Sequence, residues 1–296
     1  MGKNIIIDCK TNVSKLNQYL YNNNLFGAGE DYKDSVFILD KEIEIWQIPL
    51  SAKNNLKTLK NFVEKIKKED ISGIIMSENV RKNEEISKFL SDNLKFFDGK
   101  NITDYFFEDI YHKYLALNNK KDYEAELVVF SDNAEKTYNF LNKICKKLKN
   151  VYIVSDDYNG FDEVIKKIYE EFGFYIYFTK KTGNVFLKDR IYINLSENTD
   201  FFLKEAEENN IIILNLSGKS ILSKSMLNTF VFRISKEFKE VIKFFKYCDQ
   251  ECVEFLINSF KKNLSKEKIK EFIFEQNVNL KKICSKNYWQ NKLYLL

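Results

Sequence analysis

Short apolar runs alternate with helical patterns between residues 127 and 234, and this alternation constrains the fold more than any other feature of the chain. Each run is apolar at nearly every position, which is typical of strands covered on both faces. The runs cover residues 127–130, 151–154, 174–178, 191–195, 211–214 and 230–234. Strands that alternate with helices form parallel sheets through right-handed crossovers. We therefore predict a parallel α/β domain over residues 126–235.

This predicted domain is Rossmann-like, and weaker patterns flank it on both sides. Residues 1–98 carry further strand-like runs and helical patterns, which predict a smaller α/β domain. The aromatic-rich stretch from Tyr105 to Leu117 predicts a linking helix within residues 99–125, and residues 236–296 carry the pattern of C-terminal helices. The predicted fold class is thus α/β, with a Rossmann-like parallel sheet domain preceded by a smaller α/β domain and followed by C-terminal helices.

The charges of the chain are mixed, because 47 basic and 43 acidic residues leave a net charge of +4. A nucleic-acid-binding surface needs clustered basic residues, so we expect no nucleic-acid partner. No window approaches the ~18 uncharged apolar residues of a membrane span, and the N-terminal sequence lacks the apolar core of a signal peptide. The five cysteines are widely spaced. Together these features favour reduced thiols and a cytoplasmic protein with no membrane partner.

The loops that follow the predicted strands are where a ligand site is expected. Ligands of open parallel sheets sit beyond the carboxyl ends of the strands, where the strand order reverses. A cleft between the two predicted domains would bring these loops to one ligand, a nucleotide or another small molecule. The candidate binding residues in these loops are Asp132, Asp156, Thr179, Ser196 and Gly218.

The order of the predicted elements resembles that of the shikimate dehydrogenase and glutamyl-tRNA reductase group of NAD(P)-dependent proteins. The resemblance covers residues ~100–245 best and rests on element order together with the runs 191–196 and 211–218. It implies NAD or NADP as a possible cofactor. The catalytic residues of that group do not carry over, because the first domain has no convincing Lys/Asp pair.

The glycine fingerprint of dinucleotide-binding domains is missing from this chain. Its glycines let a pyrophosphate approach backbone N–H groups at a helix N-terminus. Ser131-Asp132-Asn133 stands in that place, without glycine and with a carboxylate where an anion would bind. Asp156 stands where an acidic residue would bond a ribose hydroxyl, although Asp156 and Asp157 also fit as turn and cap residues.

Two glycine-containing stretches resemble parts of phosphate-binding loops. Residues 217–220 read Ser-Gly-Lys-Ser, but the position that needs the first glycine of a P-loop is Ile213. We interpret this stretch as a turn or helix start. Residues 27–30 read Gly-Ala-Gly-Glu and follow a helical pattern, so Gly27 is interpreted as a helix C-cap.

Few residues offer nucleophilic or metal chemistry. His112 is the only histidine, so any histidine-dependent acid–base step has to use it, and its place among aromatic residues favours packing. Cys248 and Cys252 are four residues apart and are predicted to share a helix face. A metal site would need two further ligands, so packing is the favoured interpretation.

These observations leave two classes of function open. The first is a non-catalytic or regulatory Rossmann-like protein that senses a ligand, acts as a scaffold or binds a protein partner. The missing glycines and the lack of an acid–base constellation favour it. The second is an NAD(P)-dependent oxidoreductase with an atypical nucleotide-binding loop, which the element order and Asp156 favour.

Overall fold

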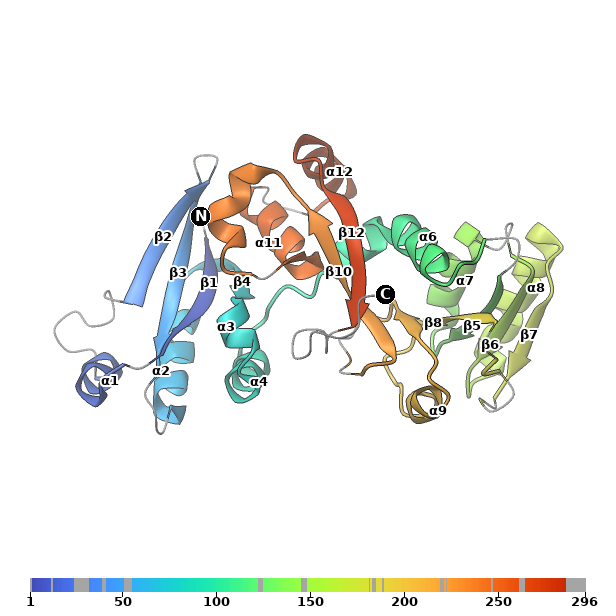
Figure 1. The fold of residues 1–296 in the computed structure, drawn as a ribbon, viewed down its shortest axis with the longest axis horizontal. Coiled ribbons are helices and arrows are strands. Elements are labelled where there is room, and N and C mark those ends of the chain that lie inside the picture. The colour runs from blue at the N-terminus through green and yellow to red at the C-terminus, as the bar shows by residue number, and fades with distance from the viewer. Residues whose placement is uncertain are drawn as a thin grey trace. The chain divides into compact units, whose positions relative to one another are not determined.

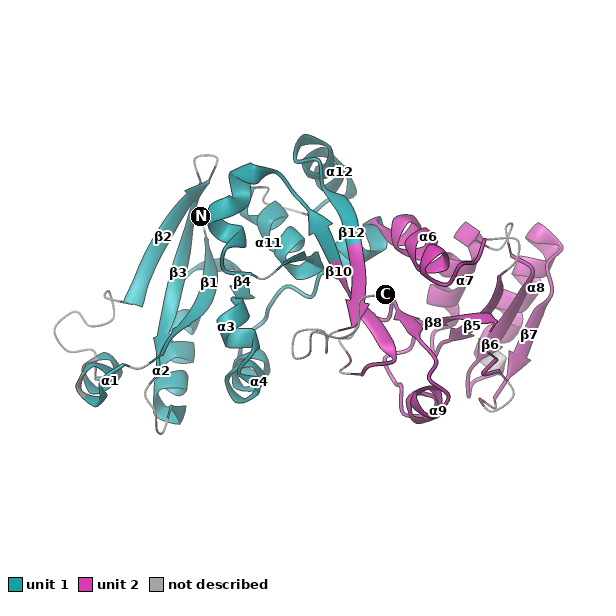
Figure 2. Ribbon diagram, viewed as in Figure 1, with its two compact units in different colours: residues 1–105, 231–281 teal, residues 106–230, 282–296 magenta. Residues whose placement is uncertain are grey.

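The chain folds into two compact units, and each is built from two separate segments of the sequence (Figure 2). Unit 1 consists of residues 1–105 and 231–281, and unit 2 consists of residues 106–230 and 282–296. The structure, a computed structural model, describes residues 2–11, 13–23, 32–38, 41–50, 55–121, 125–144, 148–180, 182, 185–187, 189–218, 221, 223–245, 247–260 and 264–285.

Unit 1 contains a four-stranded sheet in the order β2-β3-β1-β4. β1 is parallel to β3 and to β4, whereas β2 is antiparallel to β3. The elements of its first segment are β1 (Lys3–Lys10), α1 (Lys15–Asn22), β2 (Lys33–Ile38), β3 (Lys41–Pro49), α2 (Leu56–Lys67), β4 (Ile71–Met76), α3 (Glu78–Arg81), α4 (Glu84–Asn93) and α5 (Lys100–Tyr105). The smaller α/β arrangement expected in this part of the chain is present.

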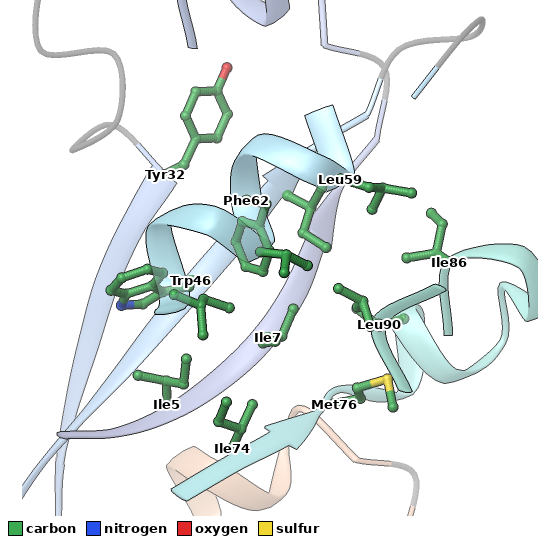
Figure 3. Packing of buried hydrophobic residues seen from close by; sticks show 14 of the residues in the cluster. Ile5, Ile7, Tyr32, Trp46, Leu59, Phe62, Ile74, Met76, Ile86 and Leu90 are labelled. Carbon is green, nitrogen blue, oxygen red and sulfur yellow. The ribbon is translucent and has the colours of Figure 1, made fainter. Parts of the chain in front are cut away.

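The core of unit 1 forms where alternate residues of its strands meet α2 and α4 (Figure 3). Ile5 and Ile7 of β1 point to the same face as Trp46 of β3, because side chains alternate along a strand. The ring of Phe62 from α2 meets the Trp46 ring edge-on, with centroids 6.2 Å apart. α2 buries Leu59, Phe62, Val63 and Ile66 on one stripe, at the spacing of an amphipathic helix.

The C-terminal segment differs from the separate set of helices predicted for residues 236–296, because residues 231–281 belong to unit 1. Its elements are a 3-10 turn (Lys236–Phe238), α10 (Lys239–Ile242), β11 (Cys248–Asp249), α11 (Gln250–Phe260), α12 (Lys266–Glu275) and β12 (Asn279–Ser285). α11 is buried on most of its surface, including Val253, Phe255 and Leu256. β12 is a strand where helix was predicted, since it pairs with β10.

Unit 2 contains a parallel sheet that confirms the predicted Rossmann-like domain. Its strands are β5 (Glu126–Phe130), β6 (Asn150–Val154), β7 (Ile176–Thr179), β8 (Arg190–Asn194), β9 (Ile213–Asn215) and the first part of β10 (Met226–Arg233). They lie in the order β7-β6-β5-β8-β9-β10, and each neighbouring pair is parallel. Counted from β5, this is the 3-2-1-4-5-6 order of dinucleotide-binding domains. The order reverses between β5 and β8.

Helices cover the two faces of this sheet unequally (Figure 1). α6 (Phe107–Leu117), α7 (Ala134–Ile144) and α8 (Asn159–Phe172) lie toward one face, and α9 (Leu203–Glu208) lies toward the other, below β8. The single linking helix predicted within residues 99–125 is instead two helices, α5 in unit 1 and α6 in unit 2. No helix among the described residues has the length and apolar character needed to cross a membrane.

Candidate functional site

The candidate site lies in unit 2, at the carboxyl ends of β5 and β8, where the strand order reverses. The loop after β5 carries Asp132, and the loop after β8 carries Ser196. Asp132 Oδ2 lies 2.6 Å from Ser196 Oγ. Two of the residues expected at the site are therefore in direct contact, and their contact spans the position where a dinucleotide-binding domain holds its ligand.

The N-terminus of α7 is already capped by its own chain. Asn133 Oδ1 accepts a hydrogen bond of 2.8 Å from the Lys136 backbone N–H. The Thr137 hydroxyl lies 2.7 Å from Ser131 Oγ and 2.8 Å from the Asn133 carbonyl oxygen. A cap of this kind satisfies an N–H group that a bound anion would otherwise use. The loop therefore holds the helix start without an anion.

Lys136, in the first turn of α7, reaches across the reversal point. Its Nζ donates to the carbonyl oxygen of Leu195 at 3.2 Å and to that of Ser217 at 2.9 Å. These carbonyls lie just after β8 and β9, so one side chain links three loops at the carboxyl edge. Lys136 could not be identified from the sequence, since a lysine in a helix is usually solvated, and only the strand order brings these carbonyls near it.

A buried pair of amides positions the loops after β8 and β9. Asn194 is fully buried, and its Nδ2 donates to Asn215 Oδ1 and to the Ser196 carbonyl oxygen, both at 2.9 Å. The backbone N–H of Ser196 donates to Asn194 Oδ1 at 3.0 Å, and that of Ser217 donates to Asn215 Oδ1 at 3.2 Å. Neither residue stands out in the sequence, because Asn194 lies within an apolar run and Asn215 directly follows one. An asparagine at the same place in two neighbouring strands was the available signal.

Asp156 and Asp157 follow β6 and have different surroundings. Asp157 Oδ1 accepts the Gly160 N–H at 3.3 Å, which fits the cap interpretation for this residue. A Cβ atom at Gly160 would lie 2.7 Å from Asp157 Oδ2, so a larger residue there would have to shift the Asp157 carboxylate. Asp156 is exposed, and among the described residues it has no hydrogen bond or ion pair. It remains a candidate for a ribose hydroxyl.

The remaining two expected residues lie on either side of this centre. The Thr179 carbonyl accepts the Ser155 N–H at 3.2 Å, which places Thr179 at the outer strand, beyond β6. Gly218 follows Ser217 with a φ of 87°, a left-handed conformation that favours glycine. The rest of the stretch 217–220, Lys219 and Ser220, lies outside the described residues, as does Gly27 with residues 28–30.

His112, Cys248 and Cys252 are the residues that the sequence offered for nucleophilic or metal chemistry. His112 is exposed on α6, with its ring 5.7 Å from that of Tyr111, so the expected packing role does not bury it. Cys248 lies in β11 and Cys252 lies in α11, so the two do not share one helix. A hydrogen bond with Cys248 and burial raise the pKa of the Cys252 thiol. No group of three or more His, Cys, Asp or Glu side chains is placed to hold a metal within the described ranges.

The chain was compared with known proteins at the levels of sequence and structure. No protein-family model and no curated protein matches its sequence. A solved shikimate dehydrogenase in complex with NADP+ is 12% identical, covering 92% of this chain and 95% of its own, with a TM-score of 0.29. The Listeria monocytogenes shikimate 5-dehydrogenase, solved with shikimate and NAD, is also 12% identical, covering 73% and 87%, with a TM-score of 0.27.

A third similar structure is the L-tryptophan dehydrogenase of Nostoc punctiforme, at 8% identity, covering 92% of this chain and 87% of its own, with a TM-score of 0.29. The α/β class of the protein rests on its own sheet order and strand directions. Shikimate and amino-acid dehydrogenases are thus among the solved structures to which this chain is similar.

Proposed function

We propose that this protein is a non-catalytic or regulatory Rossmann-like protein, which uses a dehydrogenase-type fold to bind a partner or sense a ligand. The observation that carries the proposal is the contact between Asp132 and Ser196 across the strand-order reversal. In dinucleotide-binding domains this position belongs to the pyrophosphate. Here it is taken by a carboxylate, which repels a phosphate instead of binding it.

Lys136 supports the same conclusion. A lysine near a pyrophosphate would offer its ammonium group to the phosphate oxygens. The Lys136 ammonium group instead donates to the carbonyl oxygens of Leu195 and Ser217. A bound pyrophosphate would have to displace these hydrogen bonds as well as the Asp132 carboxylate. Both costs lower the affinity of an ordinary NAD(P)-binding mode.

One observation favours the second candidate, an NAD(P)-dependent oxidoreductase with an atypical loop. Asp156 follows β6, the strand next to β5, and its carboxylate is exposed. An acidic residue at this place bonds a ribose hydroxyl in dinucleotide-binding domains. A cofactor held by its ribose, with its phosphates displaced from α7, would use Asp156 without the glycine fingerprint.

Thermal unfolding with and without saturating NAD, NADH, NADP and NADPH separates the two candidates. A ligand at ~100-fold its dissociation constant adds about 2.7 kcal/mol of stability, which raises the midpoint of a chain this long by at least ~2 °C. We expect no shift with any of the four. A shift with one cofactor would overturn the proposal in favour of the oxidoreductase.

If one of the cofactors shifts the midpoint, two variants test whether Asp156 holds it. If the cofactor is held through Asp156, the Asp156→Ala substitution removes a charge-assisted hydrogen bond and weakens binding by ~1–3 kcal/mol. Glu208→Ala is the matched control, because Glu208 is an exposed carboxylate at the end of α9, which leads toward the amino end of β9. This control leaves the midpoint shift unchanged.

A further inference from the structure

The outermost strand of the unit 2 sheet, β7, has an open edge. β7 ends the strand order, and among the described residues it pairs only with β6. Proteins usually protect such edges with charged residues, proline or bulges. Residues 174–179 read Phe-Tyr-Ile-Tyr-Phe-Thr, without a charge, proline or glycine. This edge therefore has the sequence of a strand that another strand covers.

The backbone groups that face the open edge belong to Ile176 and Phe178. The Thr179 carbonyl accepts the Ser155 N–H, so the backbone groups of Thr179 face β6. Backbone groups alternate in direction along a strand, so those of Tyr177 also face β6. The N–H and C=O groups of Ile176 and Phe178 point the other way, where a further strand can bond to them.

The face of the sheet beside this edge is rich in exposed tyrosine. Tyr175 and Tyr177 have exposed fractions of 69% and 52%. The Tyr177 ring stacks on that of Tyr152 at 5.0 Å, and the Arg190 guanidinium lies 3.9 Å from the Tyr152 ring centre. α8 lies against the opposite face, where the rings of Phe161 and Phe178 have centroids 5.9 Å apart.

We propose that β7 pairs antiparallel with β7 of a second copy of this chain, with Tyr177 on the twofold axis. A twofold axis makes the interface self-complementary, so one open edge satisfies another. In this register Ile176 of one copy exchanges backbone hydrogen bonds with Phe178 of the second copy, and the reverse. The two Tyr177 side chains face each other as a non-hydrogen-bonded cross-strand pair.

Charge complementarity favours this antiparallel arrangement. It places Lys180 of one copy opposite Phe174 of the second copy, directly after the C-terminus of α8. A helix C-terminus carries partial negative charge, and a cation there is stabilising. α8 has no basic residue in its last turn, where Glu170 and Glu171 are exposed. Lys180 of the second copy supplies the missing positive charge.

The first test is the mass of the full chain by sedimentation velocity between ~1 and ~100 µM, a range that spans the micromolar dissociation constants of weak interfaces. We expect a species of twice 35.2 kDa at the high end. Tyr177→Lys places two ammonium groups face to face and should give a monomer, whereas the matched Tyr177→Phe should remain a dimer. Circular dichroism checks that both variants fold. A monomer at every concentration, or a dimer that survives Tyr177→Lys, overturns the proposal.

The second test fixes the register with single cysteines and oxidised glutathione as the oxidant. Facing residues of a non-hydrogen-bonded pair have Cα atoms ~4.5 Å apart, which suits a disulfide. Tyr177→Cys should therefore give a linked dimer on a non-reducing gel. Tyr175→Cys is the matched control, because residue 175 lies opposite Thr179, ~13 Å from its own copy.

The natural protein has cysteines of its own, so the amount of disulfide-linked dimer that it forms is the background of this assay. Equal linking of the two variants, or no linking of either above that background, overturns the register. Neither test depends on whether the loops after β5 and β8 bind a nucleotide, so failure here is separate from failure of the proposed function.

Discussion

Asp132 Oδ2 lies 2.6 Å from Ser196 Oγ, although 64 residues of chain separate them. The contact joins the loops after β5 and β8 at the point where the strand order reverses. Because a hydroxyl-to-carboxylate hydrogen bond is charge-assisted, it holds both loops in place without any ligand. The same contact places a negative charge where dinucleotide-binding domains place a phosphate.

The strength of this contact can be measured with a double-mutant cycle. We expect Asp132→Ala to lower the free energy of unfolding by about 1 kcal/mol, since it removes the hydrogen bond with Ser196. Ser196→Ala should cost more, because the buried Ser196 hydroxyl also bonds the carbonyl oxygen and the N–H of Asn198. The double variant should lose less than the sum, with a coupling of at least ~0.5 kcal/mol, because the two residues are in contact. Urea unfolding gives all four values. Strict additivity would mean that the contact contributes nothing.

Lys136, which is half-buried in the first turn of α7, should contribute to stability through its two hydrogen bonds. Lys136→Met keeps most of the side-chain volume and removes both hydrogen bonds to the Leu195 and Ser217 carbonyl oxygens. Partly buried carbonyls left without a donor cost ~1–3 kcal/mol. Lys166→Met is the matched control, since the Lys166 side chain is 75% exposed on α8, and it should change stability by less than ~0.5 kcal/mol. Equal effects of the two variants would contradict the assigned role.

A buried ion pair holds the C-terminal segment within unit 1. The Arg81 guanidinium lies 2.5 Å from Asp249 Oδ2 and 2.9 Å from Glu251 Oε2. The Asp249 side chain is 6% exposed, so removing its partner leaves a buried charge. We expect Arg81→Met to destabilise the protein by ~3–5 kcal/mol.

Lys82→Met is the control for this ion pair, because Lys82 is exposed and its pair with Glu78 joins neighbouring turns of the chain. Such pairs contribute less than ~1 kcal/mol. Chemical unfolding followed by circular dichroism measures both variants. If Arg81→Met lost no more stability than Lys82→Met, the pair would not be what holds residues 231–281 in unit 1.

Glu254 should make part of the stability depend on pH. Burial raises the pKa of its carboxyl group, and hydrogen bonds from Asn101 and from the Gly99 N–H offset this only in part. A carboxyl group whose pKa is higher in the folded state binds more protons there than in the unfolded state. Its contribution to stability therefore falls as the pH rises from the unfolded value, about 4.3, through the folded one.

Glu254→Gln does not titrate, so the difference in unfolding free energy between this variant and the natural protein isolates the effect. Above the folded pKa the difference should be constant, and below it the natural protein should gain stability relative to the variant. Urea unfolding at a series of pH values between 4 and 8 measures it. A difference that stays flat across the whole series would show that Glu254 has the same pKa in both states.

Much of the fold could be predicted from local pattern. The apolar runs of the sequence correspond to β5, β6, β8 and β9 within a few residues. These runs could be predicted as strands because a strand covered on both faces must be apolar throughout. The division of the chain into units could not be predicted, since α11 packs in unit 1 against β3, β4 and α5, which come from the first part of the sequence.

The sequence determined which loops would form the candidate site. The tertiary structure decided which hydrogen bonds those loops make with one another. The missing glycines and the Asp132 carboxylate were visible in the sequence, because a backbone that approaches phosphate closely needs glycine. Lys136 and the buried Asn194 gain their roles only from the order of β5, β8 and β9. Sequence periodicity records which residues are buried, whereas hydrogen bonds between loops depend on which strands are neighbours, and only the folded sheet decides that.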